Sequence, residues 1–326
     1  MPSQKMDLAG KVVFITGAAR GIGEETARRA AARGAHIALA GLEPERLARI
    51  TDELGPGHTW AACDVTDQAS LDAAVAKTVA DLGGIDVVIA NAGIANQGTV
   101  ATSPADAVAR TLEVNLIGVS RTVSATLPHV TERRGYLLLV SSLAAFTGLP
   151  GMAAYCGSKA GVEHFGNALR FELAHKGVDV GTAHMGWIDT DLVRDVKADS
   201  STFEETLRRM PGPLGALTSV GDCADGFLRG IERRQRRIFV PRSVAVIAAL
   251  RPITFSWLGD LPVLKAAATM VPQLEEQFRR TGRAFGRSSA GMGSNVHEDT
   301  TQAAMTRETA PITPGTTATT PTGASG

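Results

Sequence analysis

Two side chains with complementary chemistry, Tyr155 and Lys159, stand four residues apart in a stretch with a helical pattern. Residues at this spacing project from one face of a helix. An ammonium group beside a phenol favours the phenolate, so we expect Lys159 to lower the pKa of Tyr155 from its ordinary value near 10. Such a phenol is a general acid and base for an alcohol or carbonyl oxygen. Taken alone, a tyrosine and a lysine on a helix are more often a surface pair.

A hydroxyl group could join this pair. Ser142 follows the apolar run Tyr136–Ser141, which has the length of a strand, and its side chain could hold the same substrate oxygen. A serine that ends a strand is usually a turn residue. Taken together, the three side chains favour a functional interpretation, because they share one edge of the expected sheet with a glycine-rich turn.

That turn follows the apolar run Val12–Thr16 and carries Gly17, Gly21 and Gly23. Glycines allow a sharp backbone turn and the close approach of a diphosphate, and a helix that starts near Gly21 would direct free N–H groups at the anion. The spacing is G-x-x-x-G-x-G and no Gly-Lys-Ser/Thr follows, which excludes a Walker A loop. The alternative is a tight turn whose glycines serve packing, but the strand–helix context favours nucleotide binding.

The second strand bears on which dinucleotide would bind. It ends in Gly41 and Leu42, which offer neither a carboxylate for a ribose 2′-hydroxyl nor an arginine for a 2′-phosphate. Glu43 comes later and is as well explained as a solvent-facing residue before the helix that starts at Pro44. Arg20, inside the glycine turn, could reach a 2′-phosphate. We therefore expect NADP in preference to NAD, with NAD still open.

Two further strand ends carry polar groups. Asp64, which with Val65 follows the third strand, could accept hydrogen bonds from an adenine amino group or could be an acid near a helix N-cap. The Asn91-Ala92-Gly93 segment ends the fourth strand, where ligands bind in such sheets, although an ordinary turn would look the same. The residues expected to bind the cofactor in this part of the chain are Gly17, Arg20, Gly21, Ile22, Gly23, Asp64, Val65, Asn91, Ala92 and Gly93.

Alternating strands and helices must position these residues. Runs of strand length recur at Val12–Thr16, His36–Ala40, His58–Cys63, Ile85–Ala90, Tyr136–Ser141, Val178–Ala183 and Arg237–Val240. Helical patterns lie between them at Gly21–Arg33, Pro44–Leu54, Asp67–Leu82, Ala105–Arg134, Ala153–Lys176 and Ser219–Arg233. Near-continuous apolar strands separated by helices indicate a parallel sheet covered on both faces. With right-handed crossovers, this predicts an α/β, doubly wound sheet of about seven strands.

The pattern changes after residue 243, so residues 1–243 are expected to form one dinucleotide-binding catalytic domain. Residues 244–287 have a helical pattern but are too few for an independent core, which predicts a helical extension. Residues 288–326 contain no leucine and no aromatic residue. Such a composition buries too little apolar surface to fold, so we expect a disordered Thr/Ala/Gly/Pro-rich tail.

Composition excludes several classes of function. The chain has 326 residues with 33 basic and 33 acidic side chains, and this balance argues against a nucleic-acid binder held by bulk charge. Three scattered cysteines form neither a disulfide framework nor a metal-binding motif. With no secretory signal and no run of transmembrane length, they favour a reducing, cytoplasmic location and no metal site.

Together the motifs resemble the short-chain dehydrogenase/reductase family of Rossmann-fold oxidoreductases. The matching stretches are T-G-x-x-x-G-x-G at Thr16–Gly23, N-A-G at Asn91–Gly93, N-x-x-G at Asn115–Gly118 and Y-x-x-x-K at Tyr155–Lys159. Ser142 stands thirteen residues before Tyr155, as is usual in the family. The resemblance covers about residues 8–242, and the combination is far more specific than any single motif.

The resemblance implies hydride transfer between NAD(P)(H) and a secondary alcohol or ketone, with no metal. It makes Tyr155 the proton donor or acceptor and Ser142 the group that orients and polarises the substrate oxygen. Lys159 would lower the pKa of Tyr155 and bind the ribose of the nicotinamide half. Asn115 would hold a water that links Lys159 to solvent, although it could also be an ordinary polar residue of a long helix.

One departure from the family concerns the loop after the sixth strand, where the family usually has Pro-Gly and then Thr. Here Met185 replaces the proline, while Gly186 and Thr190 remain. Gly186, Thr190 and the Ile188 backbone would still be expected to bind the cofactor, near the nicotinamide carboxamide. Without the fixed φ of proline, this loop could be more mobile or shifted.

The resemblance also makes residues 190–218 a lid over the substrate. This lid and the region after Ser142 are rich in apolar side chains, which favours a lipophilic alcohol or ketone, although these residues could serve lid packing alone. The side chains concerned are Phe146, Leu149, Met152, Trp187, Val193, Val196, Phe203, Leu207, Met210, Leu214 and Leu217.

Three further expectations concern partners and competing functions. The helical patterns Ala105–Arg134 and Ala153–Lys176 resemble the pair through which family members dimerise, so a homodimer or homotetramer is expected. The basic run Arg233–Arg237 with Arg242 and Arg251 could seat the chain on an anionic membrane, but a solvated helix end and an extension packed on a partner subunit are favoured. A non-catalytic dinucleotide sensor, or a lyase or epimerase of the same fold, remain alternatives. The sequence argues against a serine hydrolase, because no G-x-S-x-G elbow occurs and no histidine is placed by spacing to activate Ser142.

Overall fold

The computed structural model describes residues 5–96, 98–199, 207–208 and 215–286. Seven strands form one parallel sheet in the order β3-β2-β1-β4-β5-β6-β9. Their bounds are β1 (Val12–Thr16), β2 (His36–Gly41), β3 (Thr59–Ala62), β4 (Val87–Ala90), β5 (Tyr136–Val140), β6 (Asp179–Met185) and β9 (Arg237–Val240). The order reverses between β1 and β4, so the expected doubly wound, Rossmann-type sheet is confirmed.

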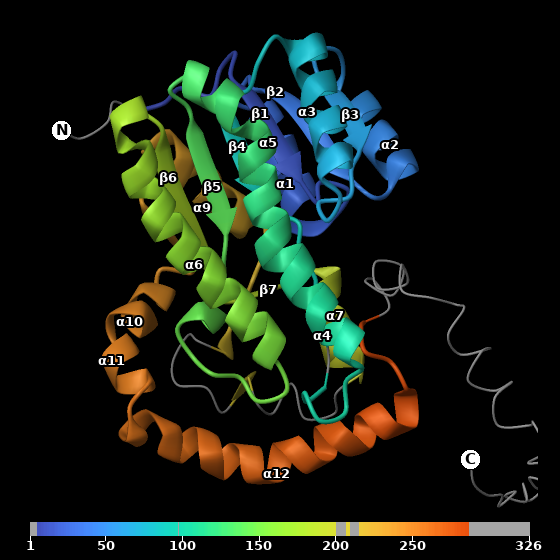
Figure 1. Cartoon of the computed structure of the whole chain (residues 1–326), viewed down its shortest axis with the longest axis vertical. Coiled ribbons are helices and arrows are strands. Elements are labelled where there is room, and N and C mark those ends of the chain that lie inside the picture. Colours follow the sequence, from blue (N-terminus) through green and yellow to red (C-terminus); the bar gives the residue numbers. More distant parts are fainter. Residues whose placement is uncertain (1–4, 97, 200–206, 209–214, 287–326) are drawn as a thin grey trace, which may run out of the picture.

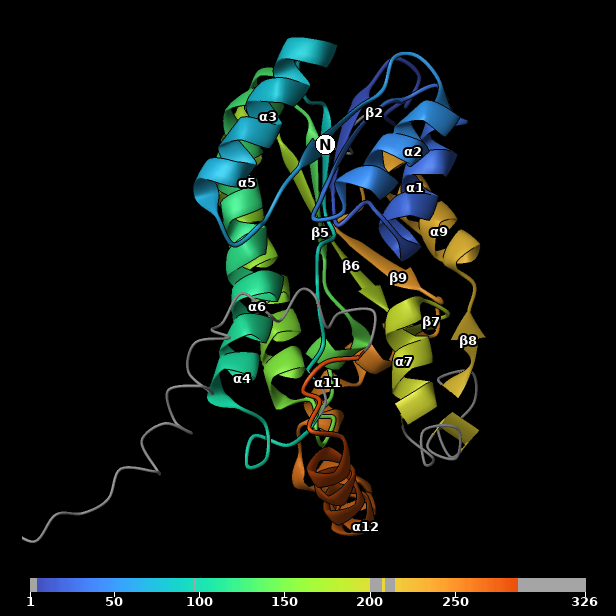
Figure 2. The same cartoon turned by 90° about the vertical axis from the view of Figure 1, so that its right-hand side faces the viewer.

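Helices cover both faces of the sheet, as Figure 2 shows. On one face lie α1 (Gly21–Ala31), α2 (Pro44–Leu54) and α9 (Val220–Glu232); on the other lie α3 (Gln68–Leu82), α4 (Ala105–Leu112), α5 (Gly118–Glu132) and α6 (Ala153–Leu173). Strand residues alternate between the two apolar cores, with Ile15 and Ile89 facing α1 and α9 while Phe14 and Val88 face α3 and α5. Burial on both faces explains why the strands are nearly continuous apolar runs.

The expected helix over residues 105–134 is interrupted. Between α4 and α5 the backbone forms one π-helical turn, η1 (Glu113–Ile117), with the buried Asn115 at its centre. Such turns insert into α-helices where a side chain makes contacts that regular geometry would not allow. Here the Asn115 amide is bonded to the backbone of Ile94 beyond β4 rather than to its own helix.

Short elements complete the fold at the carboxyl end of the sheet. A 3-10 turn, η2 (Leu143–Ala145), follows β5, and η3 (Ala174–Lys176) ends α6. A small parallel pair, β7 (Trp187–Ile188) with β8 (Leu217–Thr218), was not expected from the sequence, and α7 (Asp191–Asp199) lies within the expected lid. These elements lie near the edge where the strands end.

Three helices follow β9: α10 (Val244–Ala249), α11 (Arg251–Thr254) and α12 (Trp257–Thr281). Figure 1 shows α12 crossing the molecule below α4 and α6, at the same end as α7. No helix among the described residues is long and apolar enough to cross a membrane. The segment expected to form a disordered tail, 288–326, lies outside the described residues.

Candidate active site

Hydrogen bonds connect the end of β1 with the segment that follows β4. At the end of β1, Thr16 Oγ1 accepts hydrogen bonds from the backbone N–H groups of Asn91 (3.1 Å) and Ala92 (3.2 Å). In return, Asn91 Nδ2 donates to Thr16 O at 3.0 Å and to Gly17 O at 3.2 Å. The turn after β4 is thereby tied to the glycine turn after β1.

The glycine turn needs its glycines at two points. Gly17 adopts φ +63°, in the left-handed region, and a Cβ there would lie 2.8 Å from Ala92 Cα. A Cβ on Gly23 would lie 2.4 Å from Gly17 O and 2.8 Å from Asn91 Nδ2. The first turn of α1 therefore packs directly against the glycine turn and presents its N-terminus to the cleft, as an anion site requires.

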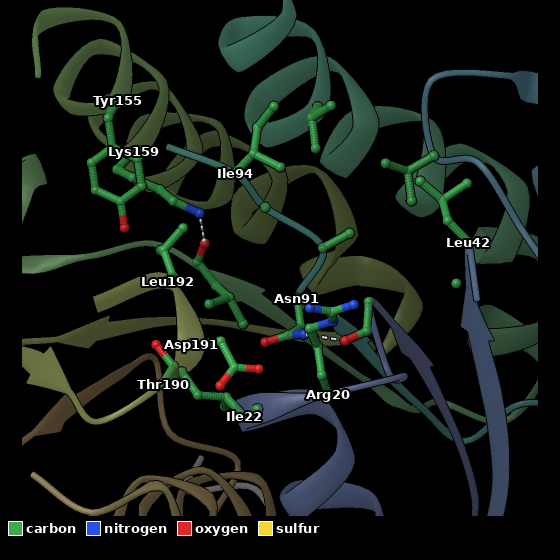
Figure 3. A pocket seen from close by; sticks show the side chains of 18 of the residues that line it. Arg20, Ile22, Leu42, Asn91, Ile94, Tyr155, Lys159, Thr190, Asp191 and Leu192 are labelled. Atoms are coloured by element: carbon green, nitrogen blue, oxygen red, sulfur yellow. Dashed lines mark hydrogen bonds between the residues drawn. The ribbon is translucent and has the colours of Figure 1, made fainter. Parts of the chain in front are cut away.

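A cleft runs along this edge of the sheet (Figure 3), with Tyr155 at one end and Leu42 at the other. Most of the residues expected to bind cofactor line it: Gly17, Arg20, Gly21, Ile22, Asp64, Val65, Asn91, Ala92, Gly93, Tyr155, Lys159 and Thr190. Five expected site residues do not line this cleft. Gly23 lies beneath the turn, Asn115 and Ile188 are buried, and Ser142 and Gly186 face a second pocket.

That second pocket is largely apolar and meets the cleft at Tyr155. It is lined by Ala95, Ser142, Leu143, Ala144, Leu149, Met152, Tyr155, Gly186, Trp187, Leu192 and Val193. Phe146 was expected in its wall but points away, packing on His184 and Phe239 with ring centroids 4.5 and 6.4 Å distant. The ring is buried in an apolar cluster with Ala145 and Val244. Leu207 is buried and Leu217 is exposed, while Phe203, Met210, Leu214 and the Val196 side chain lie outside the described residues.

Tyr155 and Lys159 project side by side from the first turns of α6 (Figure 3). Lys159 Nζ donates to Val140 O at 3.0 Å and lies 5.6 Å from the centroid of the Tyr155 ring. The Ser142 side chain lies near enough to the Tyr155 hydroxyl to act on its pKa. The Tyr155 and Ser142 hydroxyl groups thus lie near each other, and the ammonium group is anchored to the end of β5.

The expected lowering of the Tyr155 pKa is wrong for this structure. Burial raises the pKa of Tyr155, and the interaction with Ser142 opposes only part of that rise. Burial also lowers the pKa of Lys159 to about 8. Removing a charged group from water disfavours its charged form, so burial raises the pKa of the phenol and lowers that of the ammonium group. At neutral pH the phenol is therefore protonated and able to donate.

Asn115 acts on the site through the backbone. Its Oδ1 accepts from Ile94 N and its Nδ2 donates to Ile94 O, both at 2.8 Å. Nδ2 also donates to Ser158 Oγ at 3.1 Å, and Ser158 Oγ donates to Tyr155 O at 2.7 Å. The π turn therefore links the end of β4 to the first turn of α6.

The other end of the cleft carries two ion pairs. Arg20 Nε donates to Glu43 Oε2 at 2.8 Å, so Glu43 is not simply solvent-facing. Asp64 pairs with Arg110 from α4, a residue that sequence reasoning missed because no motif marks it. Although burial alone would raise the pKa of Asp64, hydrogen bonds from Thr66 and the Arg110 guanidinium hold it below its ordinary value.

The loop with Met185 in place of proline is well held. Met185 pairs with Val240 as the last residue of β6, its side chain is buried, and Gly186 N donates to Val240 O at 2.8 Å. Thr190 N donates to Ile188 O at 2.7 Å. The pairing of Met185 with Val240 and the β7–β8 pair thus restrict this loop in place of a proline.

Residues 274–286 cross the rim of the second pocket. A Cβ on Gly151 would lie 2.7 Å from Leu274 Cδ1, and a Cβ on Gly98 would lie 3.2 Å from the Phe278 ring. Phe285 forms a bridge with Asn96, and Gly286 lies against Asp195 of α7. The end of the extension therefore contacts the segment after β4, the loop after β5 and helix α7.

The glycine turn makes a prediction of its own. Gly23→Ala is expected to destabilise the fold by about 1–3 kcal/mol, because the new methyl group meets backbone atoms. It should also weaken dinucleotide binding about tenfold or more, since displacing Gly17 disturbs the anion site. Thermal unfolding and calorimetric titration with NADH and NADPH measure both. Gly157→Ala is the matched control, because nothing lies within 4 Å of its added Cβ; an equal loss in both variants would contradict this account of the turn.

Comparisons with known proteins agree with this geometry. The family profile described as short chain dehydrogenase matches residues 11–201. The chain is 32% identical over 231 residues to 2,3-dihydro-2,3-dihydroxybenzoate dehydrogenase of Bacillus subtilis (strain 168), covering 68% of this chain and 88% of that protein. It is 32% identical over 212 residues to the 3-oxoacyl-(acyl-carrier-protein) reductase FabG of Vibrio cholerae, covering 64% and 86%.

A solved structure has the same fold. A short-chain dehydrogenase/reductase from Burkholderia phymatum in complex with NAD superimposes with a TM-score of 0.67 at 22% identity, covering 76% of this chain and 95% of that one. The profile match spans more than half of the chain and the fold agrees with it. The chain therefore belongs to the short-chain dehydrogenase/reductase family and is an NAD(P)-dependent oxidoreductase.

Proposed function

We propose that this enzyme transfers hydride between NAD(P)(H) and a lipophilic secondary alcohol or ketone, with Tyr155 as general acid and base. The observation that carries the proposal is the position of Tyr155, which lines both the dinucleotide cleft and the apolar pocket and lies near Ser142. A substrate oxygen at this junction would lie within reach of two hydroxyl groups, the geometry that proton transfer requires.

The residues of the cleft fit a dinucleotide. The glycine turn removes Cβ atoms beside the N-terminus of α1, which suits a diphosphate, and Asp64 at the far end suits an adenine amino group. Thr190 lines the cleft near Gly21 on the side of the lid. When bound, the nicotinamide supplies the hydride chemistry, and the protein supplies position and protons.

The side chains divide the remaining tasks. Ser142 would orient and polarise the carbonyl oxygen, and the Tyr155 phenol would donate its proton to that oxygen in reduction. Lys159, protonated below pH 8 because its pKa is about 8, would stabilise the tyrosinate that remains. Asn115 would position Tyr155 through Ser158 rather than touch the substrate.

The lining of the second pocket supports a lipophilic substrate. Leu149, Met152, Trp187 and Val193 surround Ser142 and offer no charged partner for a sugar phosphate or a polyol. The raised pKa of Tyr155 supports reduction at neutral pH, because a protonated phenol is the form that reduction consumes.

The experiment that tests the function follows the near-ultraviolet absorbance of reduced nicotinamide across a panel of carbonyl compounds. Aliphatic and cyclic ketones of increasing size should be reduced with higher kcat/KM than sugars or keto acids of similar length. Dinucleotide binding without turnover of any ketone or alcohol would contradict the proposal and favour a sensor.

For the cofactor, we propose NADP. Arg20 lines the cleft whereas its partner Glu43 does not, which supports the guanidinium rather than the carboxylate as the group that would meet the ribose. No carboxylate stands at the end of β2, where a ribose 2′-hydroxyl would be bound. This favours a 2′-phosphate.

We also propose a homodimer or homotetramer. Phe171 on α6 is 69% exposed, and on α12 Trp257 is 71%, Leu261 56% and Leu264 64% exposed. Contact with further copies of the chain would remove these exposed apolar side chains from water. Light scattering of the purified chain measures the state directly, and a monomer at micromolar concentration would contradict the proposal.

A further inference from the structure

The short helix α11 of the extension contacts the helix that carries Tyr155 and Lys159. Arg251 Nη1 donates to Glu163 Oε2 at 3.0 Å, and the Glu163 side chain is only 2% exposed. Glu163 lies one turn beyond Lys159 on α6. Its other oxygen accepts from Arg237 Nη2 of β9 at 3.1 Å, so a buried carboxylate is held by two arginines from the C-terminal part of the chain.

The same helix holds the loop that carries Ser142. Thr254 Oγ1 donates to Phe146 O at 2.9 Å, and the Arg251 guanidinium lies 5.8 Å from the centroid of the Phe146 ring. The Phe146 ring packs on His184 at 4.5 Å, and His184 Nδ1 lies 3.4 Å from Ser142 O. Burial lowers the pKa of His184 to about 3, so this ring is a neutral spacer between Phe146 and Ser142.

The end of β5 is already tied to α6, because Lys159 Nζ donates to Val140 O at 3.0 Å and Ser141 Oγ donates to Lys159 O at 2.8 Å. The extension adds a second connection between these two elements, behind the site. The Ser142 loop ends β5, whereas Tyr155 opens α6, and the two hydroxyls must share one substrate oxygen. A displacement of about 1 Å between reacting groups can cost about a hundredfold in rate. Contacts that fix the loop against α6 from behind therefore act on catalysis without touching substrate.

We infer that Arg251 and Thr254 are positioning residues that hold the Ser142 hydroxyl against Tyr155, so that the C-terminal extension forms part of the active site. This rests on the proposed roles of Ser142 and Tyr155. Arg251 bridges α6 and the ring of Phe146, and Thr254 fixes the backbone of the same loop through Phe146 O.

The test uses Thr254→Val, which keeps the shape of the side chain and removes the donor. The matched control is Ser256→Ala, two residues on, whose hydroxyl donates to Ile253 O within the extension and does not contact the loop. We expect Thr254→Val to lower kcat about tenfold with an unchanged KM for the dinucleotide, and Arg251→Met to lower it up to about a hundredfold. Arg251→Lys should recover part of the loss, because it restores the charge beside Glu163. Ser256→Ala should match the unmodified enzyme.

A second readout does not depend on turnover. In a Tyr136→Phe background, Tyr155 is the single remaining tyrosine of the chain, so tyrosinate absorbance against pH reports its pKa alone. Loosening Ser142 removes the interaction that favours the phenolate, so Thr254→Val should raise this pKa and Ser256→Ala should not.

The outcomes separate the inference from the function on which it rests. If Thr254→Val and Arg251→Met lowered only the melting temperature, with kcat and the Tyr155 titration unchanged, the residues would be structural and the inference wrong. If no carbonyl compound were turned over by any variant but the titration moved as expected, the proposed function would fail while the positioning role stood.

Discussion

Tyr155→Phe is expected to lower kcat for ketone reduction by about a thousandfold or more, with little change in dinucleotide affinity. The phenylalanine ring keeps the packing of α6 but cannot donate a proton, and general acid catalysis contributes about 10²–10⁴-fold. Stopped-flow absorbance of reduced nicotinamide measures the rate, and calorimetric titration measures binding.

The other tyrosine of the chain supplies the control. Tyr136 is fully buried in β5 and its hydroxyl donates to Gln235 O at 2.6 Å, away from both pockets. Tyr136→Phe should cost about 1 kcal/mol of stability through that lost hydrogen bond and leave kcat intact. If Tyr155→Phe kept full turnover, or if both variants lost activity equally, Tyr155 would not be the acid.

Arg20→Ala is expected to lower kcat/KM for NADPH about 10- to 100-fold more than for NADH. A charge-assisted hydrogen bond to a phosphate contributes about 1.5–3 kcal/mol, and each 1.4 kcal/mol is tenfold. Glu43→Gln should have the opposite effect, because it removes the carboxylate that neutralises Arg20 and would repel the 2′-phosphate.

Initial rates with both dinucleotides, at fixed ketone, measure the ratio. Arg28→Ala is the matched control, since Arg28 lies on α1 and, like Arg20, pairs with glutamate (Glu24 and Glu53), but it does not line the cleft. An unchanged ratio of kcat/KM for NADPH to that for NADH in Arg20→Ala would mean that other residues distinguish a 2′-phosphate from a 2′-hydroxyl.

The sequence predicted the sheet and the side chains at its edge, because both depend on local patterns. Buried parallel strands are apolar along their whole length, and the glycine turn sits where the first strand becomes a helix. The register of the parallel strands β1, β4 and β5 then brings Thr16, Asn91 and Ser142 to one edge of the sheet. This does not depend on the side chains that lie beyond that edge.

The features that could not be predicted from the sequence are those that depend on side-chain direction and burial. The Arg20–Glu43 and Arg110–Asp64 pairs join residues from different elements, and no motif marks them. The direction of Phe146 follows from the space beside His184. The Tyr155 pKa was predicted with the wrong sign because spacing reveals the neighbouring ammonium but not the desolvation of the phenol.

The most direct test of the account is the titration of Tyr155 in Tyr136→Phe protein. The account predicts a pKa above the ordinary tyrosine value near 10, because the hydroxyl is buried, and a further rise in Ser142→Ala. Ketone reduction should accordingly be flat up to about pH 8, fall as Lys159 loses its proton, and fall further where the phenol ionises. Alcohol oxidation should rise as the phenol ionises. A pKa at the ordinary value, unchanged by Ser142→Ala, would mean that the hydroxyl is surrounded by water. This result would contradict the proposed proton transfer.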